Sequence, residues 1–277
     1  MYARFFVTPQ WFYDHITDKN VIILDASSKK PLEKTNYQYL FYKKHIPSAQ
    51  FLNLNIFDKY SILPHMLPDT LTFNNIIADL GISNSHQVII YDQGDLFSAP
   101  RAWWTFKIFG CNHVKILAGG LSGWEKAGYF VESGISTFRK KQRFIIKYSS
   151  DYVLSKQEVL SLLGKSDIQF IDSRTTARFN AKEPEPRTGL RMGHIPGSKN
   201  VPWFWLVNKG CYKKPKKLNT IFHKQGVNTM MPTVISCGSG ITAAVVFLAL
   251  IILGNDQVKL YDGSWAEWGK DNSLPIE

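Results

Sequence analysis

The segment 236–242 (Ser-Cys-Gly-Ser-Gly-Ile-Thr) places Cys237 in a glycine-rich turn between two apolar runs. Residues 232–235 predict the end of a buried parallel strand, and residues 241–253 predict a buried helix. A turn of this kind directs backbone N–H groups and the positive end of a helix at the sulfur, which favours the thiolate over the thiol. A cysteine that only fills a core does not need Gly238 and Gly240 beside it, whereas a loop wrapped around an anion does. We therefore expect Cys237 to be a nucleophile.

The other two cysteines, Cys111 and Cys211, lack this setting. An odd number of cysteines, and only three in 277 residues, does not build a disulfide scaffold, so a reducing cytoplasm fits best. The first residues lack the apolar core of a signal peptide. The longest apolar run, 241–253, is shorter than the roughly 20 residues of a membrane span. We expect a cytoplasmic monomer that does not bind membranes.

The formal net charge of +11 raises the possibility of nucleic-acid binding. The lysines are scattered, however, with small clusters at 139–141 and 213–217, and no nucleic-acid motif accompanies them. A solvated basic surface that attracts a small anionic substrate is the better interpretation, and we expect no nucleic-acid partner. No spacing of cysteine and histidine is typical of a metal site, so we expect no metal and no other cofactor.

The chain repeats itself with an offset of about 145 residues. Segments 21–27, 45–49, 87–92 and 118–124 match 168–174, 194–198, 232–237 and 261–265, and the last match aligns Trp124 with Trp265. At the position of Cys237, the first half has Asp92, which cannot act as a sulfur nucleophile. We therefore expect the first half to be catalytically silent.

Each half alternates short apolar strands with helical patterns, which is typical of an α/β domain with a mainly parallel sheet flanked by helices. Expected strands are 21–25, 50–52, 88–91 and 114–117, then 168–172, 199–201, 233–236 and 257–261; expected helices are 9–16, 72–80, 100–109, 155–163 and 241–253. We predict an N-terminal domain at 1–135, an extended linker at 136–150 and a C-terminal catalytic domain at 151–277.

The paired halves, the His-Ile-Pro in each and the segment 237–242 together resemble the tandem-domain rhodanese-type sulfurtransferases. The similarity runs along nearly the whole chain and includes segments 64–68, 183–187 and 261–268. Thiosulfate sulfurtransferases of this family usually carry basic residues after the cysteine. The Cys-Gly-Ser-Gly-Ile-Thr loop is instead similar to that of 3-mercaptopyruvate sulfurtransferases, and most of all to the bacterial form.

The resemblance implies that Cys237 takes the sulfur of 3-mercaptopyruvate as a persulfide, releases pyruvate and passes the sulfur to cyanide or a thiol. A thioredoxin-type dithiol is one such acceptor. A planar guanidinium can grip a carboxylate beside a ketone, and Arg178 and Arg187 match the family positions for this role. The N–H groups that would stabilise the anionic sulfur belong to the loop residues Gly238, Gly240, Ile241 and Thr242.

In the resembling family, a serine after the cysteine works with a histidine and an acid from the first domain. Ser239 and His65 match the first two. The third position holds Asn55, which can orient an imidazole but cannot raise its basicity as a carboxylate does; Asp58 is a weaker substitute.

Other charged residues are weaker candidates for chemistry. Arg174 and Arg191 are less favoured for substrate binding, and Arg101 is more typical of a helix start. The pairs His45 and His194, and Asp25 and Asp172, occur in both halves, including the silent one, which favours structural roles.

Three alternatives accompany this interpretation. A cysteine phosphatase needs an arginine six residues after the cysteine, where this chain has Ala243, so phosphatase activity is excluded. A thiosulfate sulfurtransferase is the alternative within the same class. A non-enzymatic sulfur carrier or interaction module is the alternative of another class, although Cys237, Ser239, Arg178 and Arg187 together argue against it.

Overall fold

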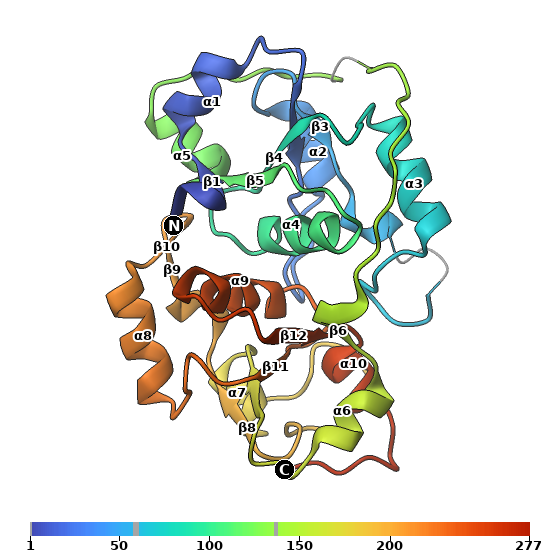
Figure 1. Cartoon of the computed structure of the whole chain (residues 1–277), viewed down its shortest axis with the longest axis vertical. Helices are drawn as coiled ribbons and strands as arrows, with labels where there is room; N and C mark the ends of the chain where they lie inside the picture. The colour runs from blue at the N-terminus through green and yellow to red at the C-terminus, as the bar shows by residue number, and fades with distance from the viewer. Residues whose placement is uncertain (1, 58–60, 136–137) are drawn as a thin grey trace. The chain divides into compact units, whose positions relative to one another are not determined.

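The computed structural model describes residues 2–57, 61–135 and 138–277 (Figure 1). The weaker acid candidate, Asp58, lies outside these residues. By its contacts the chain forms two compact units. The first comprises Met1–Lys59, Leu67–Ser149 and Lys209–Cys211, and the second comprises Tyr60–Met66, Ser150–Asn208 and Tyr212–Glu277.

The first unit contains a parallel sheet of five strands in the order β1-β5-β4-β2-β3. The strands are β1 (Phe6–Val7), β2 (Val21–Asp25), β3 (Gln50–Phe51), β4 (Gln87–Tyr91) and β5 (Val114–Leu117). Its helices are α1 (Pro9–His15), α2 (Tyr37–Lys43), α3 (Thr70–Asp79), α4 (Ala99–Ile108) and α5 (Gly120–Lys126), with 3-10 helices η1 (Tyr2–Arg4) and η2 (Leu54–Ile56). Every residue of β2 is buried, as expected for a parallel sheet covered on both faces.

The second unit repeats this sheet in the order β6-β12-β11-β7-β8, again with parallel neighbours. The strands are β6 (Val153–Leu154), β7 (Gln169–Asp172), β8 (Ser198–Asn200), β11 (Thr233–Ser236) and β12 (Val258–Tyr261). Its helices are α6 (Lys156–Leu162), α7 (Thr176–Phe179), α8 (Pro215–Lys224), α9 (Ala243–Leu253) and α10 (Ser264–Trp268), with η3 (Ser150–Tyr152) and η4 (Trp203–Trp205). A separate two-stranded sheet joins β9 (Val207–Asn208) and β10 (Cys211–Tyr212). The predicted α/β architecture is thereby confirmed.

The central helix α9 follows strand β11 through the cysteine loop. It packs on β11 and β12 and is buried along almost its whole length, which explains its apolar sequence all round. It ends at Gly254, whose φ of 98° is the left-handed conformation that favours glycine at a helix end. The helix begins at Ala243, two residues later than predicted, because Ile241 and Thr242 still form a turn.

Backbone hydrogen bonds relate the two units position by position. The Leu121 N–H donates to the Asp92 carbonyl at 2.9 Å, and the Trp265 N–H donates to the Cys237 carbonyl at the same distance. In the first unit this bond joins the start of α5 to the residue that follows the central strand β4. In the second unit it joins the start of α10 to the residue that follows the central strand β11. Asp92 therefore occupies the structural position of Cys237.

The same register corrects one detail of the repeat. Since Leu121 corresponds to Trp265, the predicted match of Trp124 with Trp265 is wrong, and Trp124 corresponds to Trp268. Both indoles are buried at the end of a short helix and donate to a later carbonyl, of Phe130 at 2.7 Å and of Pro275 at 2.8 Å. The sequence alone misled because two tryptophans stand one helical turn apart in the second half.

Two short segments belong by their contacts to the unit formed mainly by the other half of the chain. Tyr60–Met66 is part of the second unit, and Lys209–Cys211 is part of the first. In the first unit, the Gly210 carbonyl accepts the Gly119 N–H at 2.9 Å, and a Cβ on Gly210 would lie 2.7 Å from the Gly119 Cα. Only glycine fits this approach.

The predicted linker at 136–150 is described from residue 138 onward; residues 138–149 contain no helix or strand, and Ser150 begins η3. Phe144 within it is 5% exposed and packs edge-on against Phe73, with ring centroids 6.2 Å apart. Across the described residues, the helices are all too short or too polar to cross a membrane.

Candidate active site

The cysteine loop runs from the end of β11 to the start of α9. Cys237 is buried, with 2% of its surface exposed. Its N–H donates to the Ser264 hydroxyl at 3.2 Å, and its carbonyl accepts the Trp265 N–H at 2.9 Å. Ser264 has a φ of 51°, in the left-handed region that few non-glycine residues adopt. The backbone of Cys237 is thus held on both sides by the start of α10.

Sequence reasoning missed Ser264, although a comparison of the halves offered a signal. By the same register, its counterpart in the first unit is Gly120, with a φ of 55°. A serine with a positive φ is less favourable than a glycine would be at this position. Its presence indicates that the hydroxyl has a function, which here is to accept the Cys237 N–H.

Ser239 contacts His65, its predicted partner in proton transfer, and Arg187, which was predicted to bind substrate. The Ser239 Oγ lies 2.8 Å from Nδ1 of His65 and 3.3 Å from Nη2 of Arg187, which donates to it. Ser239 is 6% exposed, so its hydroxyl meets these two side chains in a largely dry environment. His65 reaches this position from the segment Tyr60–Met66, with a φ of 62°.

Arg178 approaches the same loop at Gly238. A Cβ on Gly238 would lie 2.9 Å from Nη2 and 3.7 Å from Nη1 of Arg178. The guanidinium therefore rests on the glycine backbone, and any side chain there would displace it. The two predicted substrate arginines, Arg178 and Arg187, flank consecutive residues of the cysteine loop.

The far end of the loop is tied to the sheet. The Thr242 Oγ1 lies 2.9 Å from the Ser173 Oγ, next to the end of β7. Gly240 has a φ of 79°, which lets the chain turn back toward α9, and the Ile241 side chain is buried. These contacts fix the loop whose N–H groups were predicted to stabilise an anionic sulfur.

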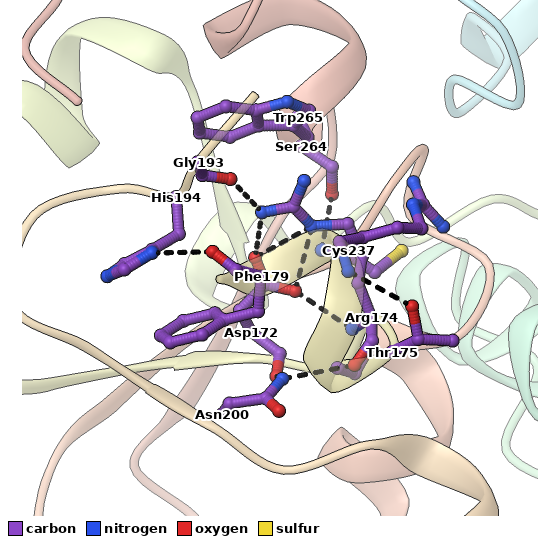
Figure 2. Close-up of polar contacts among 12 residues, drawn as sticks. Asp172, Arg174, Thr175, Phe179, Gly193, His194, Asn200, Cys237, Ser264 and Trp265 are labelled. Carbon is purple, nitrogen blue, oxygen red and sulfur yellow. Dashed lines mark hydrogen bonds and ion pairs between the residues drawn. The ribbon is translucent and has the colours of Figure 1, made fainter. Parts of the chain in front are cut away.

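Arg174, a weaker candidate in the sequence, lies at the centre of a buried cluster beside the cysteine (Figure 2). Its side chain is fully buried and donates to the Asp172 carboxylate, to Glu185 at 2.7 Å and to the Gly193 carbonyl at 2.7 Å. Its guanidinium lies 4.4 Å from the ring centroid of Trp265. Arg174 thus connects the end of β7, two loops and the helix that holds Cys237.

The corresponding loop of the first unit is closed around a carboxylate. Asp92 is buried, and its two oxygens accept four backbone N–H groups at 3.0–3.2 Å, from Gly94, Leu96, Ser98 and Ala99. The first unit therefore carries a carboxyl group where the second carries Cys237. Burial and the nearby Asp95 raise the pKa of Asp92, and the hydrogen bonds from the loop N–H groups oppose that rise.

The remaining cysteines and arginines have other surroundings. Cys111 is buried, and burial raises the pKa of its thiol to about 12, so it does not supply a thiolate. Cys211 is half-buried and unpaired with another cysteine. Arg191 donates to four main-chain carbonyls near the C-terminus, and Arg101 is buried over the Trp104 ring at 4.7 Å. Both arginines contribute to packing.

The repeated histidines have matching structural surroundings. Nδ1 of His45 lies 2.8 Å from the Phe41 carbonyl and Nδ1 of His194 lies 2.9 Å from the Phe179 carbonyl, and each ring stacks on that phenylalanine. Asn55 lies exposed in η2 of the first unit, while His65 belongs to the second, so its proposed effect on His65 stays a prediction. Across the described ranges, no group of three His, Cys, Asp or Glu side chains is arranged to hold a metal.

Comparison with known proteins gives consistent results along the whole chain. The Rhodanese-like domain model matches twice, at residues 8–127 and 155–271. The 3-mercaptopyruvate sulfurtransferase of Escherichia coli (strain K12) is 43% identical, covering 100% of this chain and 99% of that protein. The thiosulfate sulfurtransferase of Rattus norvegicus is 36% identical, covering 96% and 92%.

A solved structure agrees with these sequence matches. The crystal structure of SseA from Escherichia coli, described as a 3-mercaptopyruvate sulfotransferase with the "Rhodanese" fold, superposes with a TM-score of 0.87. It is 42% identical and covers 94% of this chain and 98% of its own. With two matching domains and full-length relatives well above 30% identity, the chain belongs to the rhodanese family.

Proposed function

We propose that this protein is a 3-mercaptopyruvate sulfurtransferase that carries sulfur as a persulfide on Cys237. The observation that carries the proposal is that Arg178 lies at Gly238 and Arg187 contacts Ser239, one and two residues after the cysteine. Two guanidinium groups beside a thiol suit a substrate that has a carboxylate and a ketone near its sulfur. The 43% identity to the Escherichia coli 3-mercaptopyruvate sulfurtransferase supports the same substrate.

In the first half-reaction, the Cys237 thiolate attacks the sulfur of 3-mercaptopyruvate. A sulfur–sulfur bond forms and the carbon–sulfur bond breaks, with its electron pair leaving as the enolate of pyruvate. Arg178 and Arg187 bind the carboxylate and the developing enolate oxygen. Protonation of the enolate carbon gives pyruvate, and the outer sulfur of the persulfide loses its proton to become the anion that the loop stabilises.

We propose that Ser239 moves a proton in this step. Its hydroxyl lies 2.8 Å from Nδ1 of His65, so a proton can pass between the substrate and the imidazole through the serine. We propose that Asn55 takes the place of the acid in this relay and leaves the imidazole less basic than a carboxylate would. Equal turnover of wild type and Asn55→Asp would contradict a tuning role for this position.

In the second half-reaction, a thiol or cyanide attacks the outer sulfur, and Cys237 leaves as the thiolate. We propose a dithiol protein of the thioredoxin type as one acceptor, a monomeric enzyme and a cytoplasmic location, where free thiols persist. We also propose that the sulfur-carrying loop belongs to the domain at 151–277, and that the loop of the domain at 1–135 is silent because it has Asp92 in place of the cysteine. That domain contributes only His65 and Asn55, and 136–150 is the linker.

Thiosulfate is the second candidate donor, because the rat thiosulfate sulfurtransferase is 36% identical over nearly the whole chain. The uncharged residues Gly238 and Ser239 provide no lysine or arginine in the loop for a doubly charged donor. We therefore expect thiosulfate to support at most a side activity.

A steady-state comparison of the two donors, with cyanide as acceptor, tests the proposal. We expect pyruvate release from 3-mercaptopyruvate with a kcat/KM at least about tenfold above that for thiosulfate. Mass spectrometry after the donor alone should find a gain of about 32 Da, one sulfur, on Cys237. Pyruvate release by Cys237→Ser at the wild-type rate would refute the nucleophile, and a preference for thiosulfate would refute the donor.

A further inference from the structure

Four ionisable side chains form a cluster beside the cysteine loop, and three of them have no role in the mechanism above. The cluster consists of Asp172, Arg174, Arg178 and Glu185. Arg174 pairs with Asp172 at 2.6 Å and with Glu185 at 2.7 Å, and Glu185 also pairs with Arg178. The carboxylate side chains of Asp172 and Glu185 are only 1% and 2% exposed. Charges this deeply buried are stable only when paired, as these are.

Arg174 is the fixed point of this cluster. Burial alone would lower its pKa, but Asp172 and Glu185 reverse that effect and raise the pKa, so it stays a cation. It donates to Asp172 through Nε and Nη2, to Glu185 through Nη1, and its plane lies against the Trp265 ring. An arginine held on so many sides cannot turn, and it fixes the carboxylate of Glu185 from one side.

Glu185 uses both its oxygens on Arg178. Oε1 accepts from Nε at 3.1 Å and Oε2 accepts from Nη2, which is the bidentate geometry that sets the plane of a guanidinium. Among the described residues, Glu185 is the only side chain that accepts from this guanidinium. The remaining N–H groups of Nη1 and Nη2 stay available on the side where Arg178 lies against Gly238.

We propose that Glu185, anchored by Arg174, is a positioning residue that aims the Arg178 guanidinium at the substrate carboxylate. The inference rests on the proposed function for the identity of that carboxylate. Arg178 has a long side chain with four rotatable bonds, and holding it in one rotamer before substrate arrives removes an ordering cost from binding.

The first unit shows that the fold itself does not require this cluster. Its residues at the positions of Asp172 and Arg174 are Asp25 and Ser27, so the buried aspartate there has no arginine two residues later. The same five-stranded sheet forms in both units. The cluster accompanies the unit that has Cys237, as expected of a device that serves the reaction.

Glu185→Gln tests this role, because it keeps the size of the side chain and removes its charge. We expect KM for 3-mercaptopyruvate to rise about 10- to 100-fold, the range for losing a hydrogen bond to a charged group, while kcat changes less than about threefold. Cyanide attack on the preformed persulfide needs no keto-acid carboxylate, so its rate should stay within about twofold of wild type. Equal losses in both half-reactions would overturn the proposal, since they would indicate general damage.

Glu183→Gln is the matched control, since it makes the same change two residues away in the same loop. Glu183 accepts from the Thr175 hydroxyl at 2.7 Å, a bond that the glutamine oxygen can keep, and it makes no pair with Arg178. We expect its KM within about twofold of wild type. In an Arg178→Ala background, Glu185→Gln should add less than about twofold to KM; an undiminished effect there would overturn the proposal.

A measurement without substrate separates this inference from the proposed function. In the nitrogen–proton NMR spectrum of the full chain, the Arg178 Nε–H should exchange slowly with water in wild type and at least about tenfold faster in Glu185→Gln. An unchanged exchange rate would overturn the positioning role whatever the donor proves to be. Failure of wild type to release pyruvate from 3-mercaptopyruvate, with the NMR change present, would instead refute only the substrate.

Discussion

Asp25 makes the stability of the first unit depend on pH in a way that one substitution can isolate. Its carboxyl is fully buried, and Oδ1 accepts the Ser27 N–H at 2.8 Å. Burial raises the pKa of Asp25 from 3.8 to about 6, and the nearby Asp92 adds to the rise. The corresponding Asp172 of the second unit pairs with Arg174.

The sign follows from proton binding. Because the pKa in the folded protein is above that of the unfolded chain, the folded state binds a proton first as the pH falls. Asp25 therefore adds stability as the pH drops from above 6 toward 4, and that stability is lost as the pH rises. The difference between the pKa of Asp25 in the folded and unfolded protein corresponds to about 3 kcal/mol of stability. About 1.4 kcal/mol of this is gained as the pH falls from 8 to 5.

Asp25→Asn removes the titration and keeps the oxygen that accepts from Ser27. We expect the free energy of unfolding of the variant minus that of wild type to be about 1.4 kcal/mol larger at pH 8 than at pH 5, because only wild type loses stability over this range. Urea unfolding followed by tryptophan fluorescence measures it, because Trp124 lies in the core of the same unit. Asp79→Asn, at an exposed carboxylate, is the control for the change in net charge. A difference between variant and wild type that does not vary with pH would refute the reasoning.

Three further changes have defined outcomes. Gly238→Ala places a methyl group 2.9 Å from the Arg178 guanidinium, so KM for 3-mercaptopyruvate should rise about tenfold in steady-state assays; an unchanged KM would contradict the contact. Asp92→Ala leaves the N–H groups of three buried residues and of the half-buried Gly94 without this acceptor, and should lower the free energy of unfolding by about 3–5 kcal/mol in urea. Gly210→Ala, with a φ of 70° and a Cβ 2.7 Å from the Gly119 Cα, should cost at least about 2 kcal/mol; a wild-type melting temperature would contradict the close approach.

The longer elements of the fold could be predicted because they bury apolar residues in regular patterns. The strands at 21–25, 114–117 and 233–236 were placed without error. The edge strands β1 (Phe6–Val7) and β6 (Val153–Leu154) were missed, since two residues carry no periodicity and only the neighbouring strand makes them part of a sheet.

In the site, too, residues with a local sequence signal could be predicted, and residues that matter through contacts distant in sequence could not. Cys237 was found because its glycines and flanking apolar runs are adjacent in sequence. Glu185 was not, because its importance lies in reaching Arg174 and Arg178 at once, which spacing in a proline-containing loop does not reveal. The sequence pointed to Glu185 only indirectly. The second half has an arginine at 174 where the first half has Ser27, and a buried arginine needs an acidic partner.

The segment Tyr60–Met66 has a consequence for how the enzyme is made. His65 and Ser239, which meet at 2.8 Å, stand 174 residues apart in the chain. At a synthesis rate of about 5–20 residues per second, the histidine leaves the ribosome roughly 10 to 35 seconds before the serine it will contact. The first unit also waits for Lys209–Cys211 to arrive. The first unit is therefore incomplete until residue 211 has been made, and the contact between His65 and Ser239 cannot form before Ser239 has been made.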